Sequence, residues 1–82
     1  MTQRIEFDPH AVLRMMERNI SRRDVQWLLA YGTKVPAHQK PGRDTRYARE
    51  GFLGEQLARV VYLDFPALLY VITIMWVWED AS

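Results

Sequence analysis

The sequence predicts a single α+β domain, residues 1–82, in which two N-terminal helices pack on one face of a C-terminal antiparallel sheet. Three observations lead to this prediction. The chain is too short for two independent cores. Two helix-start signals follow each other near the N-terminus, and strand-like segments without helical periodicity come after them. Helices followed by a run of strands, in the order β-α-α-β-β-β-β, are typical of α+β folds and not of parallel doubly wound sheets.

The first helix is expected over residues 9–18, directly after a short strand. Residues 3–7 alternate in polarity, as a strand with one buried face does. Asp8 can accept from the free amides of a helix start, and Pro9 suits the first helical position. Asn19 is expected to adopt the left-handed conformation that commonly ends a helix.

A second helix is predicted from about Arg22 to Ala30. Ser21 and Asp24 have the spacing of a capping box, with aspartate in place of the usual glutamate. Gly32 is expected to end this helix. Because one helix start follows directly on the other helix end, the two helices should form a tight hairpin or corner.

Four further strands are expected, separated by turn signals rich in glycine and proline. The predicted strands are 34–38, 45–50, 55–64 and 68–78, and the turns are 40–44, 51–54 and 65–66. The last strand is apolar on both faces, as in a strand covered on both sides. Strict alternation places Leu68, Tyr70, Ile72, Ile74, Trp76 and Trp78 on one face and Leu69, Val71, Met75 and Val77 on the other. Since two helices cover only one face, the C-terminal tail, a partner protein or a second copy must cover the other.

The composition excludes several kinds of chemistry. There is no cysteine, so disulfides, thiolate metal sites and thiol nucleophiles are excluded, and a reducing cytoplasm is the favoured location. The N-terminus lacks the apolar core of a signal peptide, and the longest apolar run, 67–77, is too short to cross a membrane as a helix. No metal-ligand spacing, glycine-rich phosphate loop or serine nucleophile motif is present, so we expect no metal and no cofactor.

The charges are distributed unevenly, although the net charge is only +1. Residues 14–49 contain nine basic side chains and three acidic ones, whereas residues 50–82 contain one basic and five acidic ones. A basic middle segment favours a polyanion or an acidic protein as the partner. The alternative is an arginine-rich surface that is only solvated.

The first group of candidate site residues lies on the first helix. His10, Arg14 and Arg18 are spaced i, i+4, i+8 and share one stripe. His10 lies in the first turn, where the helix dipole favours the neutral imidazole that a general base needs. The alternative is that His10 caps the helix or packs against the strand while both arginines are solvated.

A second group follows the 40–44 turn and consists of Arg43, Arg46, Tyr47 and Arg49. Arginine forks fit phosphate oxygens, and tyrosine can stack on a base or donate a hydrogen bond. Alternation places Tyr47 and Arg49 on one face and Arg46 on the other, so the four converge only if the strand bulges. The alternative is an edge strand whose charges prevent pairing with other molecules.

Arg59 is the third candidate, because it lies within the otherwise apolar segment 57–63. Leu57, Val61 and Leu63 share its face. Burying a cation there is costly unless an acidic group or a phosphate meets it.

The helical hairpin carries a resemblance to a known family. It reads Phe7-x-x-His10-Ala11-x-x-Arg14-Met15-x-Glu17-Arg18-Asn19-Ile20-Ser21, followed by Asp24-Val25-x-x-Leu28. This pattern resembles the opening of the small bacterial proteins of the DUF4258 family, with Asn19 in place of the usual glycine. The later basic strand, Val60-Val61 and Val71-Ile72-Thr73 fit the same family.

DUF4258 is similar in element order to the BrnT and RelE toxins of toxin–antitoxin pairs. The resemblance implies a RelE/BrnT-like fold, an antitoxin partner, and a metal-independent endoribonuclease in which the 2′-hydroxyl of RNA attacks the neighbouring phosphate. It implies His10 as base or acid, Arg46, Arg49 and Arg59 as phosphate clamps, Tyr47 as a stacking or proton-donating group, and Arg14, Arg18 and Arg43 as RNA contacts. Two other functions stay open: a non-catalytic module that binds nucleic acid or an acidic protein, and a homodimer formed through the open sheet face.

Overall fold

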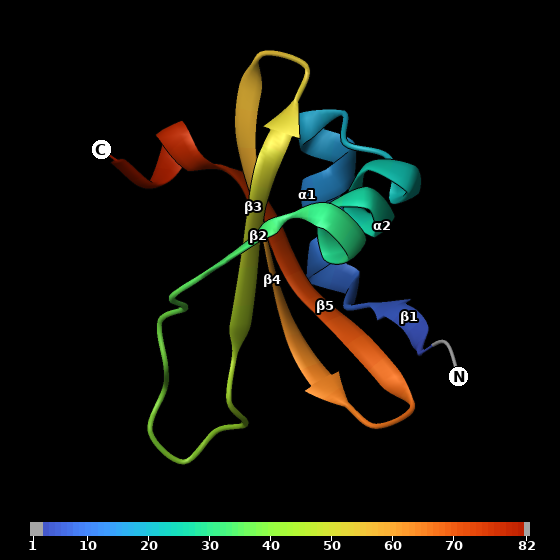
Figure 1. Ribbon diagram of the computed structural model, residues 1–82, viewed down its shortest axis with the longest axis vertical. Helices are drawn as coiled ribbons and strands as arrows, with labels where there is room; N and C mark the ends of the chain where they lie inside the picture. The colour runs from blue at the N-terminus through green and yellow to red at the C-terminus, as the bar shows by residue number, and fades with distance from the viewer. Residues whose placement is uncertain (1–2, 82) are drawn as a thin grey trace.

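The structure, a computed structural model, describes residues 3–81 and the side chains of residues 3–79. Its elements are β1 (Arg4–Phe7), α1 (Pro9–Arg18), α2 (Arg22–Tyr31), β2 (Thr33–Val35), β3 (Tyr47–Leu53), β4 (Gln56–Phe65), β5 (Leu68–Trp76) and the 3₁₀ helix η1 (Val77–Ala81). The strands form one sheet in the order β1-β5-β4-β3-β2. The predicted α+β fold and its element order are confirmed (Figure 1).

The sheet is mixed, because β1 pairs with β5 in parallel while all other neighbours are antiparallel. Both helices pack on one face of this sheet, as expected, with α1 against β5 and α2 against β3 and β4. The core lies between the helices and the sheet. Its fully buried members are Ala11, Val25, Leu28, Ala58, Val60, Val71 and Ile74.

The helical hairpin forms as the sequence predicts. The Asp8 side chain accepts from the backbone amide of His10 at 2.9 Å. Asn19 is left-handed, with φ 55°, and its backbone amide donates to the last turn of α1. Ser21 and Asp24 form both hydrogen bonds of the capping box. These signals are local, so they need no tertiary contact to be effective.

Strand β5 contains a bulge that the sequence analysis did not predict. The register passes from Tyr62 opposite Val71 to Val61 opposite Thr73, which leaves Ile72 as an extra residue. Val71 and Ile74 are therefore both fully buried, although residues three apart face opposite sides of a regular strand. The predicted assignment of faces is wrong beyond the bulge: Ile74 and Trp76 join Leu69 and Val71 on the helix side.

Several strand ends also differ from the prediction. β2 ends at Val35 and not at residue 38, since the chain leaves the sheet at Pro36, and β3 begins at Tyr47 and not at residue 45. β3 continues through Gly51 to Leu53, so the expected 51–54 turn shrinks to Gly54 and Glu55. Gly54 has φ +66°, which suits the first position of a two-residue hairpin loop. Gly51 serves close packing instead, because a Cβ there would lie 2.9 Å from Trp27. β5 ends at Trp76, where η1 begins, instead of continuing to residue 78.

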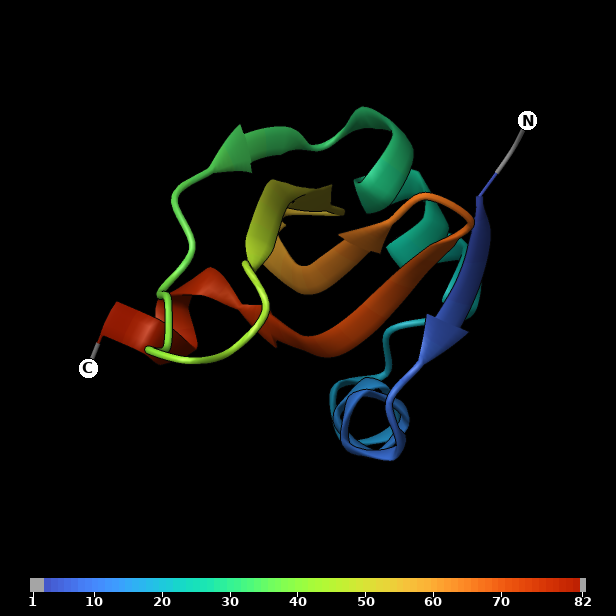
Figure 2. The same cartoon turned by 90° about the horizontal axis from the view of Figure 1, so that it is seen from below.

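The sheet face away from the helices is partly covered by the loop 36–46 and by η1 (Figure 2). Ala48 points to this face, opposite Val61, and is still only 2% exposed. η1 contacts β4 and β5. Of the three coverings that the sequence left open, the C-terminal tail thus supplies a part.

Candidate nucleic-acid interface

The loop 36–46, between β2 and β3, and its two flanking strands carry a concentration of cations. We call this region the basic loop surface; it consists of Lys34, Lys40, Arg43, Arg46, Tyr47 and Arg49. Gln39 closes the loop. Its side-chain amide donates to the carbonyls of Ala37 and Arg46, and its carbonyl oxygen accepts from the backbone amide of Arg46 at 2.9 Å. The backbone of Arg46 is therefore held in place by Gln39.

These cations have no acidic partner among the side chains that the structure describes. Every salt bridge in that part of the chain involves Arg4, Arg14, Arg18 or Arg59, none of which belongs to the basic loop surface. An unneutralised group of like charges attracts counterions or an anionic ligand. Five of the nine basic side chains of residues 14–49 thus lie on this loop or on the strands beside it.

Tyr47 and Arg49 lie on the same face of β3, as alternation predicts. Tyr47 is 40% exposed and stacks on Tyr62, with ring centroids 5.9 Å apart. Arg49 donates to the Tyr62 hydroxyl at 3.2 Å and to the Gly32 carbonyl at 2.8 Å. These two hydrogen bonds fix the position of Arg49, and both acceptors are neutral groups.

Arg43 and Arg46 reach the opposite face of the sheet. Together with Asp44 they line a small hollow of about 90 Å³ over Leu63 and Ile72. We call it the loop hollow. Arg46 also lines a hollow of about 350 Å³ between the loop and β2, together with Lys34 and Tyr47. The four candidates of this segment therefore do not meet in a single hollow, although Arg46 adjoins both Arg43 and Tyr47.

The predicted stripe on α1 does form one group. His10, Arg14 and Arg18 line a hollow of about 350 Å³ between α1 and the second half of β5, together with Thr73–Met75 and Glu79. We call it the His10 hollow. His10 is exposed, and its Nε2 accepts a long hydrogen bond, 3.4 Å, from Nε of Arg14. Of the two predicted alternatives for His10, burial against the strand does not occur.

Both arginines of the His10 hollow are paired with carboxylates. Arg14 lies 2.8 Å from Glu17, and Arg18 holds Glu79 through a two-pronged contact, with Nε donating at 2.6 Å. The Arg18 guanidinium keeps the pKa of Glu79 below its usual range, and Glu79 in turn raises the pKa of Arg18. Since these charges are already matched, the hollow is a weaker anion site than the basic loop surface.

Arg59 also has an acidic partner within the chain. Its Nε donates to Glu50 at 2.7 Å, and the two residues lie directly opposite each other on β4 and β3. Both side chains are largely shielded from solvent. The cost of burying this cation is offset by Glu50, so its presence in an apolar strand needs no phosphate.

The residues predicted to be catalytic therefore lie in separate places. His10 belongs to α1, Arg46 to the loop, Tyr47 and Arg49 to the helix side of β3, and Arg59 to the opposite side of β4. At the bulge, Ile72 lines the loop hollow and its neighbour Thr73 lines the His10 hollow. The fold thus presents a basic surface and, on another element, an exposed histidine, and the predicted catalytic residues do not form one assembled centre.

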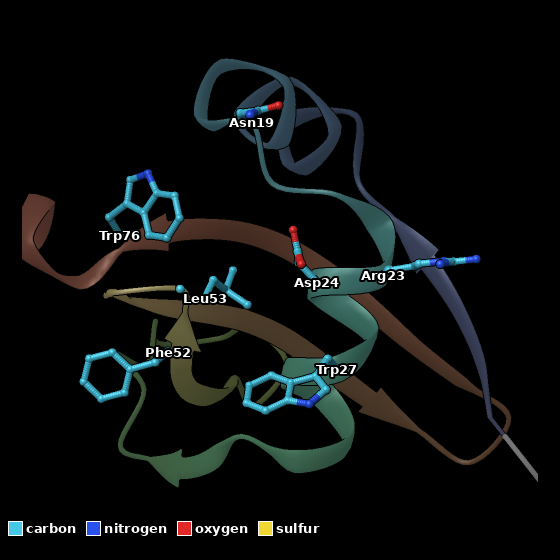
Figure 3. A pocket seen from close by; sticks show the side chains of 8 residues that line it. Asn19, Arg23, Asp24, Trp27, Phe52, Leu53 and Trp76 are labelled. Atoms are coloured by element: carbon cyan, nitrogen blue, oxygen red, sulfur yellow. The ribbon is translucent and has the colours of Figure 1, made fainter.

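A further hollow escaped the sequence analysis. It measures about 560 Å³ and lies between α2, the β3–β4 turn and the end of β5 (Figure 3). We call it the aromatic hollow, because Trp27, Phe52 and Trp76 contribute to its wall. The available signal was Trp27 itself, a large apolar residue on the outer side of a helix whose inner side is Val25, Leu28 and Leu29.

No helix in the described part of the chain is long and apolar enough to cross a membrane. Within the same residues, no three His, Asp or Glu side chains gather where they could share a metal ion.

The fold and these surfaces define a small α+β protein with a basic loop beside a mixed sheet. The chain belongs to the DUF4258 family, "Domain of unknown function (DUF4258)", whose model matches residues 7–76. The resemblance seen in the helical hairpin is thereby confirmed. No curated protein and no solved structure matches the chain.

Proposed function

We propose that this protein is an RNA-binding component of the toxin–antitoxin type and that the basic loop surface holds the RNA. The observation that carries the proposal is the group of five cations without acidic partners, set around a loop that Gln39 closes. Phosphate contacts by such cations release condensed counterions, which is the main source of affinity for nucleic acids.

Single-stranded RNA fits this surface better than an acidic protein does. Tyr47 presents an exposed ring that is braced from below by Tyr62, and unstacked bases bind to aromatic platforms of this kind. Arg49, fixed beside it, offers a guanidinium for a neighbouring phosphate. Carboxylates of an acidic protein would use the cations but would leave the tyrosine ring without a role.

RNA cleavage is a second candidate function, favoured by the position of His10. His10 is exposed at an open hollow, and its Nε2 accepts only one long hydrogen bond, from Arg14, so this nitrogen lies within reach of a substrate proton, as a general base requires. The base would take the proton of a 2′-hydroxyl, whose oxygen would bond to the adjacent phosphorus while the bond to the 5′ oxygen breaks. That leaving oxygen needs a proton, which a protonated side chain or water would supply. The strand would reach His10 from the loop hollow over the bulge at Ile72 and Thr73.

The proposal includes a protein partner and a location. An antitoxin that covers the basic loop surface would be acidic where it meets the five cations. RNA as a target and the absence of cysteine both favour the cytoplasm.

Binding is tested with a fluorescein-labelled single-stranded RNA titrated at several salt concentrations. We expect affinity to fall with salt, and Arg43→Gln with Arg46→Gln to reduce the slope by roughly 1.4, since each single-strand phosphate contact contributes about 0.7. The matched control is Arg4→Gln with Arg22→Gln, which removes the same charge elsewhere. Equal losses in both double variants would show only a general charge effect, and no binding by the natural chain would end the proposal.

Cleavage is tested separately, with the same RNA in the presence of a chelator. We expect products with 2′,3′-cyclic phosphate ends, which His10→Ala should abolish. His38→Ala is the matched control, because His38 is also exposed but lies in the loop. Intact RNA with the natural chain would restrict the function to binding.

A further inference from the structure

The aromatic hollow is built around Trp27, which projects from α2 onto the backbone of β3 (Figure 3). Gly51 allows this approach: a Cβ at that position would lie 2.9 Å from Cζ3 of Trp27 and 3.0 Å from Cδ2 of Leu28. Trp27 nevertheless remains 44% exposed. The chain thus holds a large indole in a fixed position without burying it, which is the arrangement of a binding platform and not of a core residue.

The opposite side of the hollow is equally well anchored. Trp76 packs against the core at the end of β5, and its backbone amide donates to Glu79 at 3.0 Å. Leu53 lies between the two tryptophan side chains in Figure 3. Phe52, at the rim, is 63% exposed and points away. Two indole side chains from different elements therefore flank an aliphatic floor.

Polar groups of the α1–α2 junction complete the wall. Oδ2 of Asp24 accepts from the backbone amide of Ser21 at 2.9 Å, as part of the capping box. Within residues 3–79, neither Oδ1 of Asp24 nor the side-chain amide of Asn19 has a hydrogen-bond partner within the chain. The carboxylate is directed towards the hollow, whereas Arg23 points away from it (Figure 3). The polar groups left free for a ligand are thus the Oδ1 oxygen of the Asp24 carboxylate and the side-chain amide of Asn19.

We infer that the aromatic hollow binds a nucleobase of single-stranded RNA, with guanine preferred. This inference rests on the proposed RNA-binding function. A base offers a flat apolar face to an indole, and stacking of this kind contributes substantially to single-strand binding. Guanine presents two adjacent donors, N1–H and the exocyclic amino group, which fit the open Oδ1 of Asp24 and the open side-chain oxygen of Asn19, whereas adenine presents one donor beside an acceptor. A phosphate would be repelled by Asp24, so the base and not the backbone enters the hollow.

The inference is tested by NMR on the full chain, through the indole N–H signals of its three tryptophans. GMP is the probe, and ribose 5-phosphate is the control that has the same phosphate without a base. We expect GMP to shift the signals of Trp27 and Trp76 and to leave that of Trp78, which does not line the hollow, unchanged. Ribose 5-phosphate should shift none of them. AMP should bind more weakly than GMP, and CMP and UMP more weakly still.

Two variants sharpen the test. Trp27→Leu should weaken GMP binding at least about fivefold, because stacking on one aromatic ring contributes that much or more. Trp78→Leu is its matched control and should have no effect. Asp24→Asn retains an acceptor for the Ser21 amide but should remove the preference for GMP over AMP.

Several results would overturn the inference. It fails if no indole signal moves at millimolar GMP, if ribose 5-phosphate causes the same shifts, or if Trp78→Leu weakens binding as much as Trp27→Leu. If the chain still binds RNA through Arg43 and Arg46 but no nucleotide binds to the aromatic hollow, this inference is refuted while the proposed RNA-binding function stands. Shifts of Trp27 and Trp76 caused by a partner protein but by no nucleotide would assign the hollow to protein recognition.

Discussion

Gly51 is the residue at which the aromatic platform can be tested most directly. Gly51→Ala introduces a single methyl group into β3, 2.9 Å from Trp27 and 3.0 Å from Leu28. The backbone of Gly51 is not left-handed, so alanine brings no strain of its own. The effect of the substitution is therefore a packing effect between β3 and α2.

Its magnitude follows from two opposing terms. Overpacking a well-filled site costs about 1–3 kcal/mol, while replacing glycine stabilises by about 0.4–1 kcal/mol through the unfolded chain. Leu28 is fully buried and cannot move aside, whereas Trp27 is partly exposed and can. We expect a net loss of about 1–2 kcal/mol, which lowers the melting temperature by roughly 5–15 °C in a domain of this size.

The assay is urea unfolding of four proteins: the natural chain, Gly51→Ala, Trp27→Leu and the double variant. In such a cycle the coupling energy measures the contact itself. We expect Gly51→Ala to cost clearly less when Trp27 is absent, with the remainder due to Leu28. If Gly51→Ala lowers the free energy of unfolding equally in both backgrounds, or if it stabilises the natural chain, then Trp27 is not held against β3 and does not form a fixed platform.

Three further predictions follow from other contacts. Ile74→Ala should cost about 2–5 kcal/mol in urea unfolding, as for other buried aliphatic residues, and Ile72→Ala clearly less; equal costs would contradict the bulge. Arg18 depresses the pKa of Glu79, so their interaction should stabilise the fold fully above the ordinary glutamate pKa of 4.5 and be lost as the pH falls through the lower pKa of the folded state. The melting temperature of Glu79→Gln should therefore depend less on pH in this range than that of the natural chain. Gln39→Ala should leave the charge unchanged yet weaken RNA binding severalfold in the titration above, since it frees the loop that holds Arg46; unchanged affinity would mean that loop order is irrelevant.

The parts of the fold that the sequence predicts are those that depend on neighbours along the chain. The bounds of α1, the left-handed Asn19 and the capping box of Ser21 and Asp24 all follow from side chains within four residues of the groups that they satisfy. The faces of β5 do not, because a bulge depends on how two strands meet. Nothing in the apolar run around Ile72 distinguishes a regular strand from a bulged one.

The candidate site divides in the same way. The stripe of His10, Arg14 and Arg18 lies on one helix, so its spacing alone brings the three together. The pairing of Arg59 with Glu50 depends on the register of β3 against β4, nine residues apart in sequence, and alternation alone does not identify the partner. Gly51 is expected in a turn because glycine is common there, but it lies within β3 and makes room for Trp27 of α2. A residue type alone does not distinguish these two roles of glycine.

The bulge has a consequence for function as well as for packing. If β5 ran through Ile72 without a bulge, Ile72 and Ile74 would point to the same face of the sheet. Then either Ile74 would be lost from the core or Ile72 would be lost from the loop hollow. With the bulge, Ile74 stays buried under the helices while Ile72 lines the loop hollow and Thr73 lines the His10 hollow. Deleting Ile72 would restore regular alternation with Val71 and Ile74 still facing the helices, so the deletion should retain the fold. It should nevertheless reduce any RNA cleavage, because it removes a side chain that lines the loop hollow, whereas Ile72→Val should preserve both the fold and the cleavage.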